Sequence, residues 1–174
     1  MAKDNPDEGE APIIVGMAEA ALHMYDSAIA ALPDDDDDFR ARVEVILSGL
    51  RKLRKTLTEA AARSRLTPRV IVALSEVRQR YDDLMERAAA APGSTLGQQL
   101  YVARCRAKLS ARETANGAGL RADLLDDLEA GETPTEDETV KIKELIEALG
   151  GSSQEIDEGK HEGFNIESFD ESMA

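Results

Sequence analysis

The fold is decided by residues 96–149, which read LGQQLYVARCRAKLSARETANGAGLRADLLDDLEAGETPTEDETVKIKELIEAL. Apolar and small residues recur at its start with the three- and four-residue spacing of an amphipathic helix. These positions are Leu96, Leu100 and Ala103. Ser110, followed three residues later by Glu113, is typical of a capping box that opens a second helix. We therefore expect one short helix ending near position 108 and another beginning at Ser110.

The segment after this second helix predicts a turn and two more helices. Residues 116–119, Asn-Gly-Ala-Gly, disfavour a continuing helix, because each glycine there costs about 1 kcal/mol relative to alanine. Helical spacing of apolar residues then resumes at Leu120, Leu124, Leu125 and Leu128. Gly131 predicts the end of this third helix, and Thr135 with Glu138 predicts the capping box of a fourth.

These residues resemble the lambda-repressor/Cro-like helix-turn-helix family, also called the xenobiotic-response-element family. The positions that carry the resemblance are Leu109-Ser110, Ala115, Gly119-Leu120 and Leu128-Glu129-Ala130-Gly131. The resemblance is confined to residues 96–149. It implies that a third helix, over residues 121–128, lies in the major groove of double-stranded DNA.

The charge of this third helix favours a different partner. It carries Asp123, Asp126 and Asp127 against Arg121. A helix in the major groove has to meet phosphates and base edges with hydrogen-bond donors, which carboxylates do not supply. The helix-turn-helix is therefore also compatible with a protein-interaction adaptor that has lost DNA binding.

Composition predicts an all-α fold. Among 174 residues 42% are hydrophobic but 3% are aromatic, and tryptophan is absent, so alanine and aliphatic residues have to form the core. Alternating runs of β-branched residues bounded by turns, which would predict strands, are missing. We expect N-terminal helices, a Cro-like helix-turn-helix domain over residues 95–149, and disordered acidic termini over residues 1–11 and 150–174.

Residues 12–92 are expected to form a helical N-terminal region. A first helix over residues 12–32 is predicted to face inward through Ile13, Met17, Ala20, Ala21, Met24, Ala28 and Ala31. The second, starting near Phe39, has an apolar stripe at Val43, Ile46, Leu47, Leu50, Leu53 and Leu57. The third starts at Thr67-Pro68 and has a seam at Val70, Leu74, Val77, Tyr81, Leu84 and Ala88. This seam predicts either the monomer core or the interface of a homodimer.

Residues 56–74 have a faint helix-turn-helix spacing of their own. Ala61 precedes Leu66 by the same five residues that separate Ala115 from Leu120, although Arg65 stands where the turn has Gly119. A degenerate repeat is therefore an open alternative. It would make Thr67 and Arg69 part of a basic recognition helix.

The net charge of −14 is unevenly distributed. Residues 39–112 carry 16 Lys or Arg and six acids, for +10, whereas residues 1–38 carry −10 and residues 113–174 carry −14. A basic centre between acidic flanks favours a nucleic-acid surface, and internally compensated helix faces are the alternative. The predicted DNA-contacting residues are Arg104, Arg106, Lys108, Ser110, Arg112 and Arg121, joined by Thr67 and Arg69 if the repeat exists.

Features of an enzyme or of a metal or cofactor site are lacking in the sequence. His23 and His161 do not cluster, no glycine-rich phosphate loop is present, and Cys105 has no second cysteine to share a zinc ion. Arg104 and Arg106 could lower the thiol pKa of Cys105, but a small half-buried helix residue is the favoured interpretation. We expect a cytoplasmic, non-enzymatic protein with no apolar stretch long enough to span a membrane.

The acidic C-terminal tail follows a Gly-Gly-Ser-Ser break at residues 150–153. Its scattered apolar residues cannot bury enough surface to fold alone. Residues 164–173 predict a motif that docks on a protein partner or on the basic centre, and a solubilising tail is the alternative. The leading function is a DNA-binding regulator or DNA-packaging accessory protein, and the alternative is the protein-interaction adaptor. A continuous basic face would favour DNA, and scattered basic residues would favour the adaptor.

Overall fold

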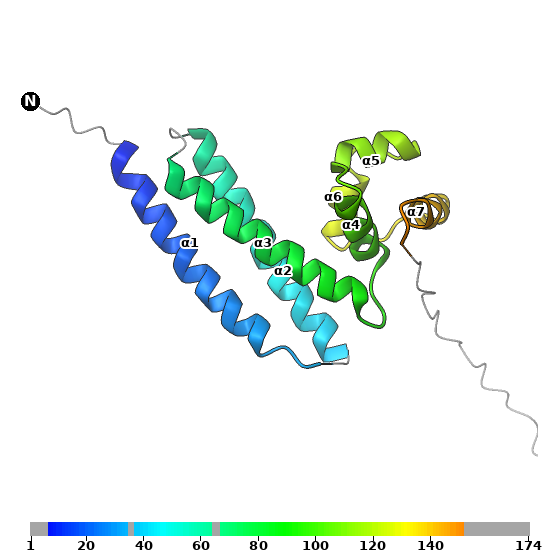
Figure 1. Cartoon of the computed structure of the whole chain (residues 1–174), viewed down its shortest axis with the longest axis horizontal. Helices are drawn as coiled ribbons and strands as arrows, with labels where there is room; N and C mark the ends of the chain where they lie inside the picture. Colours follow the sequence, from blue (N-terminus) through cyan, green and yellow to red (C-terminus); the bar gives the residue numbers. More distant parts are fainter. Residues whose placement is uncertain (1–6, 35–36, 64–66, 152–174) are drawn as a thin grey trace, which may run out of the picture.

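The computed structural model describes residues 7–34, 37–63 and 67–151, and all regular secondary structure in these ranges is helical. Three long helices come first, followed by four shorter ones (Figure 1). The long helices are α1 (Asp7–Ala30), α2 (Asp37–Arg63) and α3 (Pro68–Ala90). The shorter ones are α4 (Leu96–Arg106), α5 (Ala111–Ala118), α6 (Leu124–Glu129) and α7 (Glu136–Ala148). The prediction of an all-α fold is confirmed.

Side-chain caps fix where the short helices begin. Ser110 accepts a hydrogen bond from the backbone N–H of Glu113 at the start of α5, and Thr135 accepts one from that of Glu138 at the start of α7. Both predicted capping boxes are therefore confirmed. A third box at the start of α4, made by Thr95 and Gln98, was missed, although its T-x-x-Q spacing is the same signal.

The first hydrophobic core lies between α1, α2 and α3. The predicted stripe of α2 is buried at Val43, Ile46, Leu47, Leu50 and Leu57, with Leu53 partly buried. The seam of α3 is buried at Val70, Val77, Tyr81, Leu84 and Ala88, with Leu74 partly buried. These side chains pack within one chain, so the structure assigns the α3 seam to the monomer core.

The predicted inward face of α1 is wrong. Ile13, Met17 and Met24 are 64%, 70% and 73% exposed, whereas the buried positions are Ala11, Val15, Ala18 and Leu22. Tyr25 packs against α2 at Gly49, where a β-carbon would overlap the tyrosine ring. Asp26 on α1 accepts two hydrogen bonds from Arg80 on α3, at 2.9 and 3.1 Å. Both contacts require the rotation of α1 that leaves the predicted stripe outside.

Two expectations about the N-terminal segment also need correction. The helix begins at Asp7 rather than at Pro12, so residues 7–11 belong to α1 instead of a disordered terminus, and residues 1–6 lie outside the described ranges. Residues 11–30 have the length and mean hydropathy, 1.2, of a membrane-crossing helix, contrary to the prediction that no stretch was long enough. Core helices and signal sequences share this composition.

Residues 56–74 do not form a pair of short helices. Thr56–Arg63 is the end of the 27-residue α2, and Pro68–Leu74 is the start of the 23-residue α3. Helices α2 and α3 run antiparallel and pack side by side (Figure 1). In the described part of this segment the structure is thus a long helical hairpin, unlike the compact arrangement of α5 and α6.

The second hydrophobic core lies among α4, α5, α6 and α7. Its buried residues are Leu96, Leu100, Ala115, Leu124, Leu125, Leu128, Ile142 and Ile146. Gly97 lets α4 approach the end of α6 closely, because a β-carbon there would lie 2.8 Å from the backbone oxygen of Leu128. The two cores meet where α3 packs on α4, and Tyr101 of α4 is buried in the first core.

Candidate interaction face of the C-terminal helices

The surface around α5 and α6 is the candidate site, because the resemblance assigns nucleic-acid contact to it. Gly119 ends α5 in the left-handed conformation, with φ +61°, which glycine adopts without steric strain. The backbone N–H of Leu120 then donates to the Ala115 oxygen at 2.9 Å. The next helix starts at Leu124 rather than at Arg121 as predicted, because residues 121–123 form a turn.

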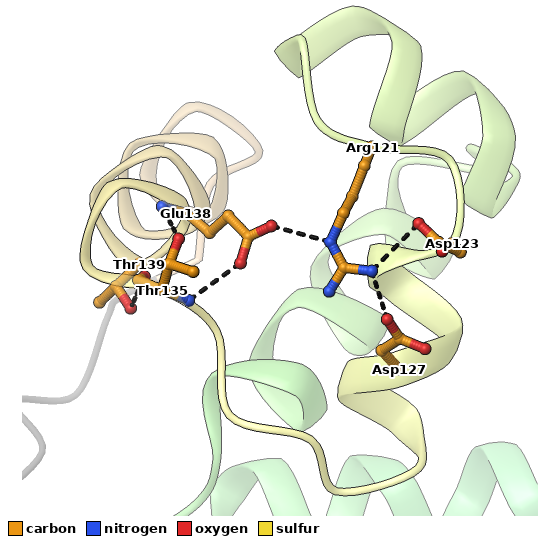
Figure 2. Close-up of polar contacts among 6 residues, drawn as sticks. All are labelled: Arg121, Asp123, Asp127, Thr135, Glu138 and Thr139. Carbon is orange, nitrogen blue, oxygen red and sulfur yellow. Dashed lines mark hydrogen bonds and ion pairs between the residues drawn. The ribbon is translucent and has the colours of Figure 1, made fainter.

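Arg121 is held by three carboxylates in this turn and across to α7 (Figure 2). Its Nε donates to Glu138 Oε1 at 2.9 Å. One Nη atom lies 3.1 Å from Asp123 Oδ1 and also donates to Asp127. Carboxylates therefore engage two of the three guanidinium nitrogens that a groove-facing arginine would offer to a phosphate or a guanine.

The electrostatics of this cluster favour the charged forms of Arg121 and Glu138. Hydrogen bonds to Asp127 and Glu138 raise the pKa of the Arg121 guanidinium above its ordinary value. The pKa of Glu138 is lowered, first by the hydrogen bond that its carboxylate accepts from the backbone N–H of Thr135 and then by Arg121. Glu138 thus links the α7 cap to the turn before α6.

Acidic residues surround the Arg121 cluster. Residues 121–138 contain eight acids and one arginine, which gives a net charge of −7. Asp126 on α6 and Glu136 and Asp137 at the start of α7 are exposed. We call the surface formed by Asp123, Asp126, Asp127, Glu136, Asp137 and Glu138 the acidic face. Its charge repels a phosphate backbone and attracts a cationic surface.

Two of the predicted DNA-contacting arginines are engaged within the chain. The Arg104 side chain is 12% exposed, donates to Glu129 Oε1 at 3.1 Å and lies 4.5 Å from the centre of the Tyr101 ring. Arg106 is exposed and pairs with Glu86 of α3 at 2.7 Å. Arg104 therefore stabilises the junction between the two cores, and Arg106 bridges α4 to α3.

The remaining predicted contacts lie in two separate places. Lys108 and Arg112 are exposed on either side of Ser110, whose hydroxyl is committed to the α5 cap. Thr67 and Arg69 lie at the start of α3, at the end of the bundle away from α4–α7 (Figure 1). The described residues do not bring the predicted set together on one face.

Sequence reasoning missed the polar junction around Glu129. The Glu129 side chain is 8% exposed and accepts hydrogen bonds from Arg104 and from the Tyr81 hydroxyl, at 3.1 and 3.2 Å. Arg54 of α2 lies 3.9 Å from the same carboxylate. Burial and the nearby Glu129 charge raise the pKa of Tyr81, so its hydroxyl stays protonated and donates. The available signal was the Leu128-Glu129-Ala130-Gly131 motif, which places a carboxylate at the end of α6.

Tyr101 completes this junction. Its ring meets the Tyr81 ring edge to face, with centroids 5.4 Å apart and an interplanar angle of 80°. Its hydroxyl donates to Asp82 Oδ1 at 2.5 Å. Aromatic pairs of this geometry contribute about 0.5–1.5 kcal/mol beyond the area they bury.

The chemistry of the remaining candidate groups is unremarkable. Cys105 is exposed, whereas the favoured interpretation had it half-buried; partial desolvation of its sulfur raises the thiol pKa, so the alternative of a thiol pKa lowered by the flanking arginines is not met. In the described ranges no group of His, Cys, Asp and Glu side chains has the geometry to hold a metal ion. A cleft of about 1260 Å³ between α2 and the loop before α7 is lined by Glu44 and Arg51, which pair with each other at 2.9 Å.

Comparison with known proteins matches the helical bundle to a family. The family model is described as MSMEG_6518_N, N-terminal domain, and it matches residues 25–95, from the last six residues of α1 through α2 and α3 to the residue before α4. An uncharacterized protein of Mycolicibacterium smegmatis (strain ATCC 700084 / mc(2)155) is 62% identical over 129 residues, which are 74% of this chain and the whole of that relative. The chain belongs to the same family as that protein. No solved structure matches.

Proposed function

We propose that this protein is a non-enzymatic, cytoplasmic interaction adaptor. In this proposal α4–α7 form a lambda-repressor/Cro-like helix-turn-helix, and its acidic face binds a basic surface on another protein. The observation that carries the proposal is Arg121 held by Asp123, Asp127 and Glu138, at the position where a DNA-reading helix needs donors.

The dispersal of basic side chains supports the same conclusion. Arg104 and Arg106 pair with Glu129 and Glu86, and Arg121 pairs with Asp123, Asp127 and Glu138. Basic residues used in this way compensate charge within the chain instead of forming a phosphate-binding track. This is the scattered arrangement that favours the adaptor over DNA binding.

DNA binding is the second candidate. Lys108 and Arg112 are exposed at the start of α5 and favour it, because helix N-termini and basic side chains both attract phosphates. This candidate predicts measurable affinity for duplex DNA at low salt, with a steep loss of affinity as salt rises.

The deciding experiment measures binding of the full chain to two labelled probes, an oligo-arginine peptide and a duplex DNA, by fluorescence anisotropy. We expect peptide binding and no DNA binding at low salt. The double variant Asp126→Lys/Asp137→Lys, which alters exposed residues of the acidic face, should weaken peptide binding about tenfold. The matched control Glu19→Lys/Asp83→Lys alters exposed acids of α1 and α3 and should leave it nearly unchanged.

Two results would count against the adaptor. Equal loss of peptide binding in the test and control variants would mean that net charge, and not the acidic face, attracts the peptide. Saturable DNA binding by the wild type, with unchanged peptide affinity in the Asp126→Lys/Asp137→Lys variant, would favour the second candidate.

A further inference from the structure

An apolar stripe runs along the outer side of α1. It consists of Ile13, Met17, Ala20, Met24 and Ala28, and we call it the α1 stripe. All five residues are exposed, and the three large ones are 64–73% exposed. At about 100° per residue they fall within an arc of about 80° on the helix. A contiguous patch of this kind on a folded chain marks an interaction surface.

Between residues 13 and 28, the carboxylates of α1 lie away from this stripe. Asp26 faces α3, where it binds Arg80, and the lowered pKa of Asp26 follows first from that hydrogen bond. Glu19 lies on nearly the opposite side of the helix from Met17. The stripe is flanked by Gly16 and Ala21, and a β-carbon at Gly16 would meet no atom within 4 Å. Along residues 13–28 another helix can therefore approach closely without meeting a carboxylate of α1.

The stripe is complementary to its own reversed copy. In an antiparallel pair with the two-fold axis between positions 18 and 19, Ile13 meets Met24 of the second copy. In the same register Met17 meets Ala20 of the second copy, so a long side chain lies against a small one. A parallel pair would stack Met17 on Met17 and Ala20 on Ala20, which alternates crowding with a void. Two-fold symmetry generates each of these contacts twice.

We infer that the α1 stripe is a homodimer interface in which a second copy of this chain packs α1 antiparallel to α1. The inference is independent of the function proposed for the acidic face. Helix α1 lies at the edge of the bundle opposite α4–α7, so the pairing leaves both acidic faces accessible (Figure 1).

The size of the contact sets its strength. A 24-residue helix is about 36 Å long and about 10 Å wide, which gives roughly 400 Å² per copy. The total of roughly 800 Å² is below the roughly 1,200–2,000 Å² of stable specific interfaces, so the dimer is weak and depends on concentration. A membrane is the competing occupant, since residues 11–30 are long and apolar enough to cross one. Crossing would carry the carboxylates of Glu19 and Asp26 into the bilayer.

Sedimentation velocity of the full chain over a range of concentrations tests the interface. We expect a monomer–dimer equilibrium, and Met17→Glu should raise its dissociation constant at least about tenfold. Helical content should not change, because Met17 is 70% exposed. The matched control is Val45→Glu, at a position on α2 that is 73% exposed and not on the α1 stripe, and it should dimerise like the wild type. A wild type that stays monomeric to about 1 mM, or equal effects of the two variants, would overturn the inference.

Cysteine cross-linking tests the antiparallel register. In a Cys105→Ser background, a mixture of the Ile13→Cys and Met24→Cys chains should form a disulfide, and neither chain should form one alone. In the antiparallel pair the two Ile13 positions are separated by 11 residues, or about 16 Å, which is too far for a disulfide. Cross-linking within each variant alone would overturn the pairing. Binding of monomers to phosphatidylcholine vesicles, abolished by Met17→Glu, would assign the stripe to a membrane instead.

Discussion

Replacing Glu129 by glutamine should destabilise the whole chain, because this carboxylate joins the two hydrophobic cores. It is 8% exposed and accepts hydrogen bonds from Arg104 and Tyr81, which belong to α4 and α3. The variant Glu129→Gln keeps the shape of the side chain and removes its charge. The Arg104 guanidinium, 12% exposed, is then left without its counter-ion.

The magnitude follows from the two contacts. A hydrogen bond to a charged group contributes about 1.5–3 kcal/mol, and breaking a buried ion pair costs about 3–5 kcal/mol. Glutamine can still accept a weaker hydrogen bond, so we expect the free energy of unfolding to fall by about 3 kcal/mol. For a chain of this size that corresponds to a fall of roughly 6–12 °C in Tm.

Urea denaturation followed by circular dichroism measures this change. Arg104→Met in the Glu129→Gln background should cost less than the sum of the single changes, with a coupling energy of at least about 1.5 kcal/mol. The control is Glu86→Gln, which breaks the exposed pair with Arg106 and should change stability by less than about 0.5 kcal/mol. If Glu129→Gln were as mild as the control, the carboxylate would not be coupling the two cores.

Three further outcomes follow from single positions. Gly97→Ala should destabilise the chain by about 1–3 kcal/mol in urea denaturation, because its β-carbon meets the Leu128 backbone oxygen at 2.8 Å. Gly117→Ala, in open space on α5, should instead stabilise it by about 0.4–1 kcal/mol, and similar losses at both glycines would refute the close approach of α4 to α6. Because the pKa of Glu138 lies below its ordinary value of 4.5, its charge contributes stability that is present at neutral pH and is lost as pH falls through the lowered pKa. The stability deficit of Glu138→Gln should therefore be measurable at pH 7 and shrink as pH falls through the lowered pKa, and a deficit that does not depend on pH would contradict the charge-based cap.

The structural features that could be predicted best from the sequence are those controlled by local contacts. The capping residues Ser110 and Thr135 act on backbone groups three residues away, so their spacing alone predicts the helix starts. The stripes of α2 and α3 were also predictable. Each of those helices has one strongly apolar side and one charged side, and the apolar side is buried.

The orientation of α1 could not be predicted in the same way. Its sequence offers two apolar stripes, one through Val15 and Leu22 and one through Met17 and Met24. The choice between the two stripes depends on contacts with other helices. The main ones are the ion pair between Asp26 and Arg80 of α3 and the packing of Tyr25 against Gly49 of α2. Neither contact has a signal within α1 itself.

The candidate site was predictable in composition but not in geometry. The acids of α6 are visible in the sequence, and they raised the adaptor as an alternative. The hydrogen bond between Arg121 and Glu138 joins residues 17 positions apart, and it depends on how α6 and α7 both pack against α4. The use of Arg104 inside the junction likewise depends on tertiary structure.

The edge-to-face contact between Tyr81 of α3 and Tyr101 of α4 fixes the orientation of helices α4–α7 relative to the bundle. Rotating these helices relative to α3 would separate the rings and break the hydrogen bond from Tyr81 to Glu129, so their direction is set when the chain folds. With two chains paired through α1, the two acidic faces would be held at a fixed distance and orientation from each other. A ligand with two basic patches would then be selected by the distance between its patches, in addition to their charge.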